Sequence, residues 1–130
     1  MMGSRKLGDI NLSDEYLSIG LEDSLTEAIH RFLSFQSGVL IVLNDHNEAK
    51  GVITQTMILQ AILDNKDLQN THCKKIMQSD ILEFSLETKL SVVMDAVEKR
   101  KPKAIVGING DGEFIGWFSP IDYQTALGYE

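Results

Sequence analysis

The sequence predicts an α/β (α+β) fold built from two β-α-β-β-α repeats that pack as an intramolecular pseudo-two-fold pair. The first observation is internal repetition, because Asn44 and Gly51 recur 65 positions later as Asn109 and Gly116 with no gap between the copies. The second is an alternation of continuous apolar runs, typical of buried strands, with apolar residues at helical spacing. The third is size: one such unit buries little surface, so two should cover each other's exposed sheet faces.

In the first repeat, Ser24 fits the N-cap of a helix and Glu27 its N3 position, as in a capping box. The continuous apolar run 39–43 predicts a strand that is buried on both faces. Residues 44–47 are turn formers, so the next strand should return as a hairpin. The sequence predicts strands over residues 16–21, 39–43 and 49–54, and helices over residues 25–33 and 55–63.

The second repeat follows the same order. Pro102 ends its first helix, and the turn 109–112 contains two glycines that can adopt positive φ. The sequence predicts strands over residues 81–86, 104–108 and 113–118, and helices over residues 90–97 and 121–127. We therefore divide the chain into an N-terminal segment (1–11), a first repeat (12–65), a linker (66–74) and a second repeat (75–128).

Composition narrows the classes of function. The net charge of −7 argues against nucleic acid or an anionic membrane as the main partner. No apolar run approaches the roughly 20 residues that span a bilayer, and the polar N-terminus does not resemble a secretion signal, so we expect a cytoplasmic protein. The basic run 99–103 fits the solvated end of a helix better than a phosphate site, although both interpretations remain open.

The sequence offers no catalytic or metal-binding constellation, so we expect a protein that is not an enzyme. Cys73, the single cysteine, cannot form an internal disulfide, and a connector thiol without a special role is favoured over a nucleophile. His30, His46 and His72 lack the spacing of metal ligands, so no metal site is expected. We find neither a nucleophile–base pair nor a glycine-rich phosphate loop.

Residues 108–122 combine a strand, an acidic glycine turn, a second strand and the pattern Gly-h-h-Ser-x-x-Asp, where h is apolar. This stretch resembles a cystathionine-β-synthase (CBS) domain, and residues 42–54 resemble it in the first copy. From about residue 12 to residue 127 the chain therefore resembles a tandem CBS pair, or Bateman module. The resemblance implies a regulatory module that binds an adenosine ligand in a cleft between the repeats and forms homodimers. Because no fused domain accompanies the repeats, we expect it to act in trans on an unknown regulated protein.

The resemblance also implies roles for individual residues. Asp122 would accept hydrogen bonds from ribose hydroxyls, while Ser119 would meet a phosphate at a helix N-terminus and Lys103 would approach the phosphates. The strand residues Ile19, Gly20 and Leu21 would hold the base through main-chain hydrogen bonds and apolar contact. A weaker, mirrored site would use Thr54, Phe84 and Ser85.

Three features leave alternatives open. Ser119 and Asp122 also fit the N-cap and N3 positions of an ordinary helix start. Met57 stands where the second copy has Asp122, so the first site should have lost ribose binding. Ile121 replaces an arginine common in the family, which favours AMP, adenosine or S-adenosylmethionine over more anionic ligands. No cofactor is required, and the alternative function is a ligand-free dimerisation or protein-interaction module.

Overall fold

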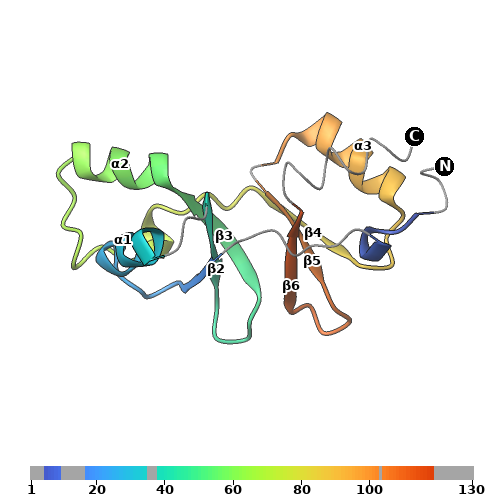
Figure 1. The fold of residues 1–130 in the computed structure, drawn as a ribbon, viewed down its shortest axis with the longest axis horizontal. Coiled ribbons are helices and arrows are strands. Elements are labelled where there is room, and N and C mark those ends of the chain that lie inside the picture. Colours follow the sequence, from blue (N-terminus) through green and yellow to red (C-terminus); the bar gives the residue numbers. More distant parts are fainter. Residues whose placement is uncertain (1–4, 10–16, 35–37, 103, 119–130) are drawn as a thin grey trace. The chain divides into compact units, whose positions relative to one another are not determined.

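The computed structural model describes residues 5–9, 17–34, 38–102 and 104–118 (Figure 1). The chain divides into two compact units. The first-repeat unit comprises residues 15–79, and the second-repeat unit comprises residues 1–14 together with residues 80–130. The segment that precedes the first repeat therefore belongs to the second-repeat unit.

The first-repeat unit follows the predicted order β-α-β-β-α. Its strands form a sheet in the order β1-β2-β3, in which β1 runs parallel to β2 and β3 returns antiparallel. Both helices lie on the same side of this sheet (Figure 1). The elements are β1 (Leu17–Gly20), α1 (Leu25–Ser34), β2 (Val39–Leu43), β3 (Ala49–Thr54), α2 (Gln55–Leu63) and a 3-10 turn η3 (Cys73–Lys75).

The second-repeat unit has the same topology, with β4 parallel to β5 and β6 antiparallel to β5. Its elements are a 3-10 turn η2 (Leu7–Asp9), β4 (Ile81–Ser85), α3 (Leu90–Arg100), β5 (Ala104–Ile108) and β6 (Phe114–Phe118). These elements confirm the predicted strands and first helix of this repeat, and the mixed fold of two similar units is confirmed with them. The helix predicted over residues 121–127 lies outside the described residues.

The two hairpins repeat each other in atomic detail, which explains why their asparagines and glutamates are identical. The Asn44 side chain accepts from the Glu48 main-chain N–H (3.0 Å) and donates to the Glu48 carboxylate (2.7 Å). Asn109 makes the same two bonds with Glu113, each at 3.0 Å. The second turn also places Gly112 at φ 81°, a left-handed conformation that glycine adopts without strain.

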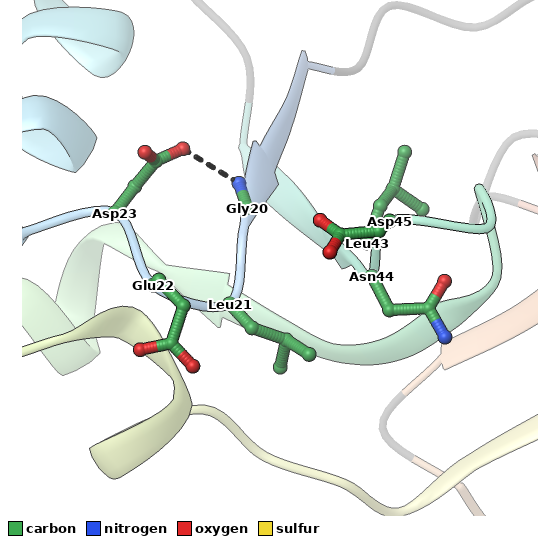
Figure 2. A pocket seen from close by; sticks show the side chains of 7 residues that line it. All are labelled: Gly20, Leu21, Glu22, Asp23, Leu43, Asn44 and Asp45. Carbon is green, nitrogen blue, oxygen red and sulfur yellow. Dashed lines mark hydrogen bonds between the residues drawn. The ribbon is translucent and has the colours of Figure 1, made fainter.

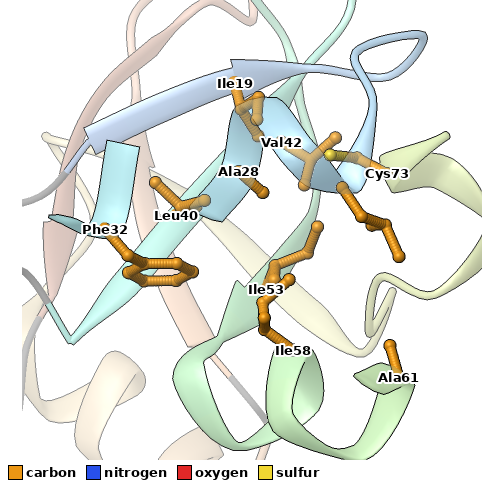
Figure 3. Close-up of a cluster of buried hydrophobic side chains, with 10 residues drawn as sticks. Ile19, Ala28, Phe32, Leu40, Val42, Ile53, Ile58, Ala61 and Cys73 are labelled. Atoms are coloured by element: carbon orange, nitrogen blue, oxygen red, sulfur yellow. The ribbon is translucent and has the colours of Figure 1, made fainter. Parts of the chain in front are cut away.

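The core of the first-repeat unit lies between the sheet and its two helices (Figure 3). Leu40 and Val42 of β2 point into this cluster, while Ile41, which lies between them on the opposite face, is also fully buried. The prediction of a strand buried on both faces is thus confirmed. The cluster contains Ile19, Leu25, Ala28, Phe32, Leu40, Val42, Ile53, Ile58, Ala61 and Cys73.

Each unit is completed by the segment that precedes the other repeat. In the second-repeat unit, the N–H of Leu7 donates to the Thr88 carbonyl (2.8 Å), and the Leu90 N–H donates to the Arg5 carbonyl (2.7 Å). The Leu7 side chain is fully buried against a cluster that includes Leu90 and Val93. Sequence patterns do not predict this arrangement, because residues 5–9 are too short to show a hydrophobic period.

The first-repeat unit receives residues 71–78 in the same way. Cys73 donates its N–H to the Asp23 carbonyl (2.8 Å), and Leu25 donates to the Thr71 carbonyl (3.0 Å). Cys73 is fully buried, and this burial raises the pKa of its thiol to about 11. The thiol that the sequence suggested as a connector group is therefore a component of the core.

The same segment also covers the outer edge of β3. Val52 and Gln78 exchange two main-chain hydrogen bonds of 2.9 Å each. Gly51 permits this close approach, because a Cβ atom there would lie 2.7 Å from the Gln78 carbonyl oxygen and 2.8 Å from the Met77 sulfur. An edge that could otherwise pair with another chain is thereby occupied within the unit.

Candidate functional site

Some of the residues predicted to bind a ligand lie within the ranges that the structure describes, and others do not. Asp122, Ser119 and Lys103 lie outside the described residues. Strand β6 ends at Phe118, directly before Ser119 in the sequence. The described candidates are Ile19, Gly20 and Leu21, together with Thr54, Phe84 and Ser85.

Thr54 stands where β3 meets α2 and caps the helix. Its hydroxyl accepts from the Met57 N–H (3.3 Å), while its own N–H points to the Met57 sulfur (3.4 Å). Met57 is also packed against the buried cluster of the unit. In the first repeat, Thr54, at the Ser/Thr position of the motif, therefore caps α2. Met57, at the position of the motif's aspartate, contributes both to this cap and to the core.

Phe84 and Ser85 lie at the end of β4. Phe84 is partly buried and packs against the cluster around Leu90, whereas Ser85 is exposed. The Ser85 hydroxyl accepts from the Glu87 N–H (3.1 Å), which shapes the turn after the strand. Both residues thus have structural roles, and their place in a ligand site stays a prediction.

Strand β1 holds the other predicted base-contacting residues, and its outer edge is already occupied. Ile19 is buried, so its side chain belongs to the core. The Gly20 N–H donates to the Asp23 carboxylate (2.8 Å), and an Arg31 guanidinium N–H donates to the Ser18 carbonyl. On the inner side, the Leu21 N–H donates to the Leu43 carbonyl (3.2 Å). A base held by this main chain would have to compete with these side chains.

A pocket of about 350 Å³ opens where β1 and β2 end (Figure 2). Sequence reasoning identified two of its residues, Gly20 and Leu21, and missed the five others. The missed signal is the acidic pair Glu22–Asp23 in the turn that follows β1, which the parallel pairing of β1 and β2 brings beside the β2–β3 turn. The lining comprises Gly20, Leu21, Glu22, Asp23, Leu43, Asn44 and Asp45.

Three of these lining residues are acidic, and two of them are engaged within the unit. Figure 2 shows the Asp23 carboxylate directed at Gly20. Glu22 pairs with Lys74 (2.6 Å) and with His72 Nδ1 (2.9 Å). The hydrogen bond from Lys74 is the main reason that the pKa of Glu22 is lowered. Such a lining repels phosphate and suits hydroxyl or amino groups.

Thr54 and this pocket lie at opposite ends of one sheet. Thr54 pairs with Val39 at the start of β2, whereas Gly20 pairs with Leu43 at its end. Val39 and Leu43 are four residues apart, so the two positions are separated by about 13 Å along the strand direction. The two groups of predicted residues in this unit therefore cannot form a single compact subsite.

The structure also bears on the charged and metal-binding candidates. Lys99 and Arg100 occupy the last turn of α3 and pair with Asp95 (3.2 Å) and Asp80 (2.9 Å). This geometry matches the solvated helix end rather than a preformed phosphate site. Among the described residues, no group of histidine, cysteine and acidic side chains could hold a metal ion. Within the same ranges, no helix has the length and apolar character needed to cross a membrane.

Known protein families and solved structures resemble this chain in sequence or in fold. The family model described as the CBS domain matches residues 7–64. No curated protein matches the sequence. The matched region begins at Leu7, within the segment that packs in the second-repeat unit.

Solved structures match nearly the whole chain. A CBS domain-containing protein of unknown function from Bacillus anthracis str. Ames Ancestor has a TM-score of 0.81 at 18% identity, covering 99% of this chain and 96% of that chain. CBSX2, solved in complex with AMP, has a TM-score of 0.75 at 16% identity, with coverages of 97% and 98%. A CBS domain pair/ACT domain protein from Thermotoga maritima has a TM-score of 0.71 at 15% identity, with coverages of 95% and 97%. At these identities the likeness is one of fold.

Proposed function

Because the chain contains a CBS domain over residues 7–64 and has the fold of CBS domain pairs, we propose that it is a non-enzymatic regulatory module that senses an adenosine-containing ligand. The ligand classes that we propose are AMP, adenosine and S-adenosylmethionine. The complex of CBSX2 with AMP supports an adenosine ligand for this fold. We further propose that the module acts in trans on a separate regulated protein.

The observation that carries the proposal is the difference between the copies at one position. Met57 and Asp122 are equivalent residues, 65 positions apart. Met57 is committed to the cap of α2 and to the core, so the first repeat has no carboxylate at this position for a ribose. A carboxylate only accepts hydrogen bonds and suits a vicinal diol, so Asp122 is the residue that we propose for ribose recognition.

The charge distribution supports a ligand with few negative charges. The chain carries a net charge of −7, and the pocket at the end of β1 is lined by carboxylates. We propose Ser119 and Lys103 as the groups that meet a single phosphate. The mirrored set of Thr54, Phe84 and Ser85 is proposed only as a weaker contact surface, because Thr54 already caps α2 and Ser85 already shapes the turn after β4.

Calorimetric titration with AMP, adenosine, S-adenosylmethionine and ATP tests the proposal. We expect AMP, adenosine or S-adenosylmethionine to bind, and Asp122→Asn to weaken binding at least tenfold. Asp111→Asn is the matched control, because it removes the same charge from an exposed turn of the same repeat. Absence of binding by all four ligands at millimolar concentration would exclude the proposal, as would equal affinities of Asp122→Asn and wild type.

A second candidate is a ligand-free protein-interaction module. The observation that favours it is the outer edge of β1, where Asp23 already bonds the Gly20 N–H proposed for a base and Arg31 bonds the neighbouring Ser18 carbonyl. In this case a partner protein should bind with the same affinity with and without AMP. Release of the partner by AMP would support the sensor instead.

A further inference from the structure

Strands β1 and β4 hold the same place in the two units, yet their outer edges differ. In the described sheets, each is an end strand that pairs with one neighbour, β2 or β5. On β1 the Gly20 N–H donates to the Asp23 carboxylate, and the Ser18 carbonyl accepts from the Arg31 guanidinium. Glu27 holds that guanidinium through an ion pair of 3.0 Å. The first repeat therefore satisfies this edge with its own side chains.

The second repeat lacks all three of the side chains that close the edge of β1. The residues that stand 65 positions further on are Thr88, Val92 and Ala96. On β4 the corresponding main-chain groups are the Glu83 carbonyl and the Ser85 N–H. Within the described residues neither group has a hydrogen-bond partner, and both residues are exposed. The outer edge of β4 at Glu83 and Ser85, here called the β4 edge, is therefore open.

The turns after the two strands have the same geometry, so the difference lies in the side chains. The Ser85 carbonyl accepts from the Thr88 N–H (3.0 Å), just as the Gly20 carbonyl accepts from the Asp23 N–H (3.2 Å). Free N–H and C=O groups on a strand edge form a template for a further strand. Extended peptides bind such edges, where main-chain hydrogen bonds supply affinity and neighbouring side chains supply specificity.

Helix α3 provides an apolar wall beside the β4 edge. In the first repeat, Arg31 reaches the Ser18 carbonyl from α1, so this face of α1 lies over the edge of β1. The equivalent face of α3 carries Val92 and Ala96. Val92 is 50% exposed, and Ala96 is small and only partly buried. The long charged side chain that fills this space in the first repeat is thus replaced by short apolar ones.

Glu83 determines the charge that this surface favours. Its carboxylate is exposed and forms no ion pair within the described residues. The acids at the two ends of the strand are already neutralised, because Asp80 pairs with Arg100 and Glu87 pairs with Lys6. A free carboxylate in the middle of an open edge, on a chain with a net charge of −7, attracts a basic side chain.

We propose that the β4 edge is a docking site for an extended segment of a partner protein, in which one basic residue stands between two apolar residues. Side chains alternate along a strand, and Phe84 packs toward α3, so Glu83 faces the other way. In an added strand, the basic residue lies beside Glu83, and its two apolar neighbours point toward Val92 and Ala96. The site needs no nucleoside, so it stands or fails independently of the adenosine proposal.

The test uses the full chain without nucleotide and the synthetic peptide acetyl-Ser-Ser-Val-Lys-Val-Ser-Ser-amide, followed by NMR spectroscopy. In the free chain the Ser85 amide should exchange rapidly with solvent. The peptide should protect this amide and shift the methyl signals of Val92 and Ala96. A Ser85 amide that is already protected in the free chain would overturn the proposal, because another segment or a second copy would then occupy the edge. Unchanged signals at millimolar peptide would overturn it as well.

The sharpest variant transfers the closure of the first repeat onto the second. Thr88→Asp/Val92→Glu/Ala96→Arg introduces the residues that the first repeat carries at these positions, and we expect it to weaken peptide binding at least tenfold. Circular dichroism must show that the variant is folded. Equal affinities of this variant and wild type, measured by calorimetry, would contradict the proposal.

A charge reversal at Glu83 tests the preference for a basic residue without altering the edge. Glu83→Lys should bind the same peptide more weakly than wild type does, and should prefer a peptide with glutamate in place of lysine. Asp45→Lys is the matched control, because it makes the same change of charge at an exposed residue of the first-repeat unit. If Glu83→Lys still prefers the lysine peptide, or if Asp45→Lys weakens binding equally, the role of Glu83 is wrong.

Discussion

Leu7 and Cys73 hold equivalent positions in the two units, although each comes from the segment that precedes the opposite repeat. Leu7 donates its N–H to Thr88 and Cys73 donates to Asp23, both at 2.8 Å, and both side chains are fully buried. The two acceptors are 65 positions apart, whereas Leu7 and Cys73 are 66 apart. The two segments that pack with the opposite repeat, here called the exchanged segments (residues 5–9 and 71–78), are therefore offset by 66 residues. This offset is one residue longer than the 65-residue offset of the repeat itself.

Shortening Leu7 should destabilise the second-repeat unit, which it does not adjoin in sequence. Leu7→Ala removes a fully buried side chain from the cluster around Leu90 and Val93, and we expect a loss of about 2–4 kcal/mol in the free energy of unfolding. Chemical denaturation, followed by the fluorescence of Trp117 on β6, measures this loss in the unit concerned.

The control for this experiment is Lys6→Ala. Lys6 forms an exposed ion pair with Glu87 (2.6 Å), and such pairs contribute little. This variant should therefore unfold almost as wild type does. If Leu7→Ala is also neutral, the role assigned to the N-terminal segment is wrong.

Adding a methyl group at Gly51 should destabilise the first-repeat unit. The new Cβ would lie 2.7 Å from the Gln78 carbonyl oxygen, so the Met77–Gln78 segment would have to move off the edge of β3. We expect Gly51→Ala to cost about 1–3 kcal/mol, measured by thermal unfolding. Gly38→Ala is the control, because nothing lies within 4 Å of a Cβ at that position. Equal melting temperatures for the two variants would contradict the close approach.

The Cys73 thiol should be nearly inert in the folded protein. Its pKa is raised to about 11 by burial, so about one thousandth of it is thiolate at pH 8. We expect dithiobis-nitrobenzoate to react with it only at the rate of local or global unfolding. Reaction in guanidinium chloride should be immediate and stoichiometric. Fast labelling of the native chain would show that η3 does not seal the core.

The ion pairs of Glu22 should make stability depend on acid pH. Its pKa is lowered from 4.5, chiefly by the hydrogen bond from Lys74, so this contribution is complete above about pH 4.5 and is lost as the pH falls through the lowered pKa. In Glu22→Gln, the drop in unfolding free energy between pH 6 and roughly pH 3 should be smaller than in wild type. Lys74→Met should reduce the drop similarly, and an unchanged drop in both variants would contradict the assignment.

Much of the fold could be predicted from the sequence because it is encoded locally. The apolar run of β2, the capping serine at Ser24 and the asparagine turns each act over a few residues, and the structure has each of them in place. The exchanged segments could not be predicted, because Leu7 and Cys73 differ in type and their main-chain partners have no signature in sequence.

The candidate site was predictable to a smaller extent. Gly20 and Leu21 were identified from the strand, but the pocket beside them depends on Asn44 and Asp45, which adjoin it only through the parallel pairing of β1 and β2. The role of Met57 as a cap was also missed, because methionine is not a usual partner in a capping box. The ligand roles of Asp122, Ser119 and Lys103 stay predictions.

The crossed N-terminal segments also bear on how such a chain could arise. A single ancestral repeat with its own leading segment would have had no partner for that segment within the same molecule, so two copies would have had to lend them to each other. A tandem duplication would place both segments in one polypeptide. The same dependence means that a cut between Thr71 and Cys73 leaves neither half whole, because the first fragment lacks Cys73 from its core and the second lacks Leu7.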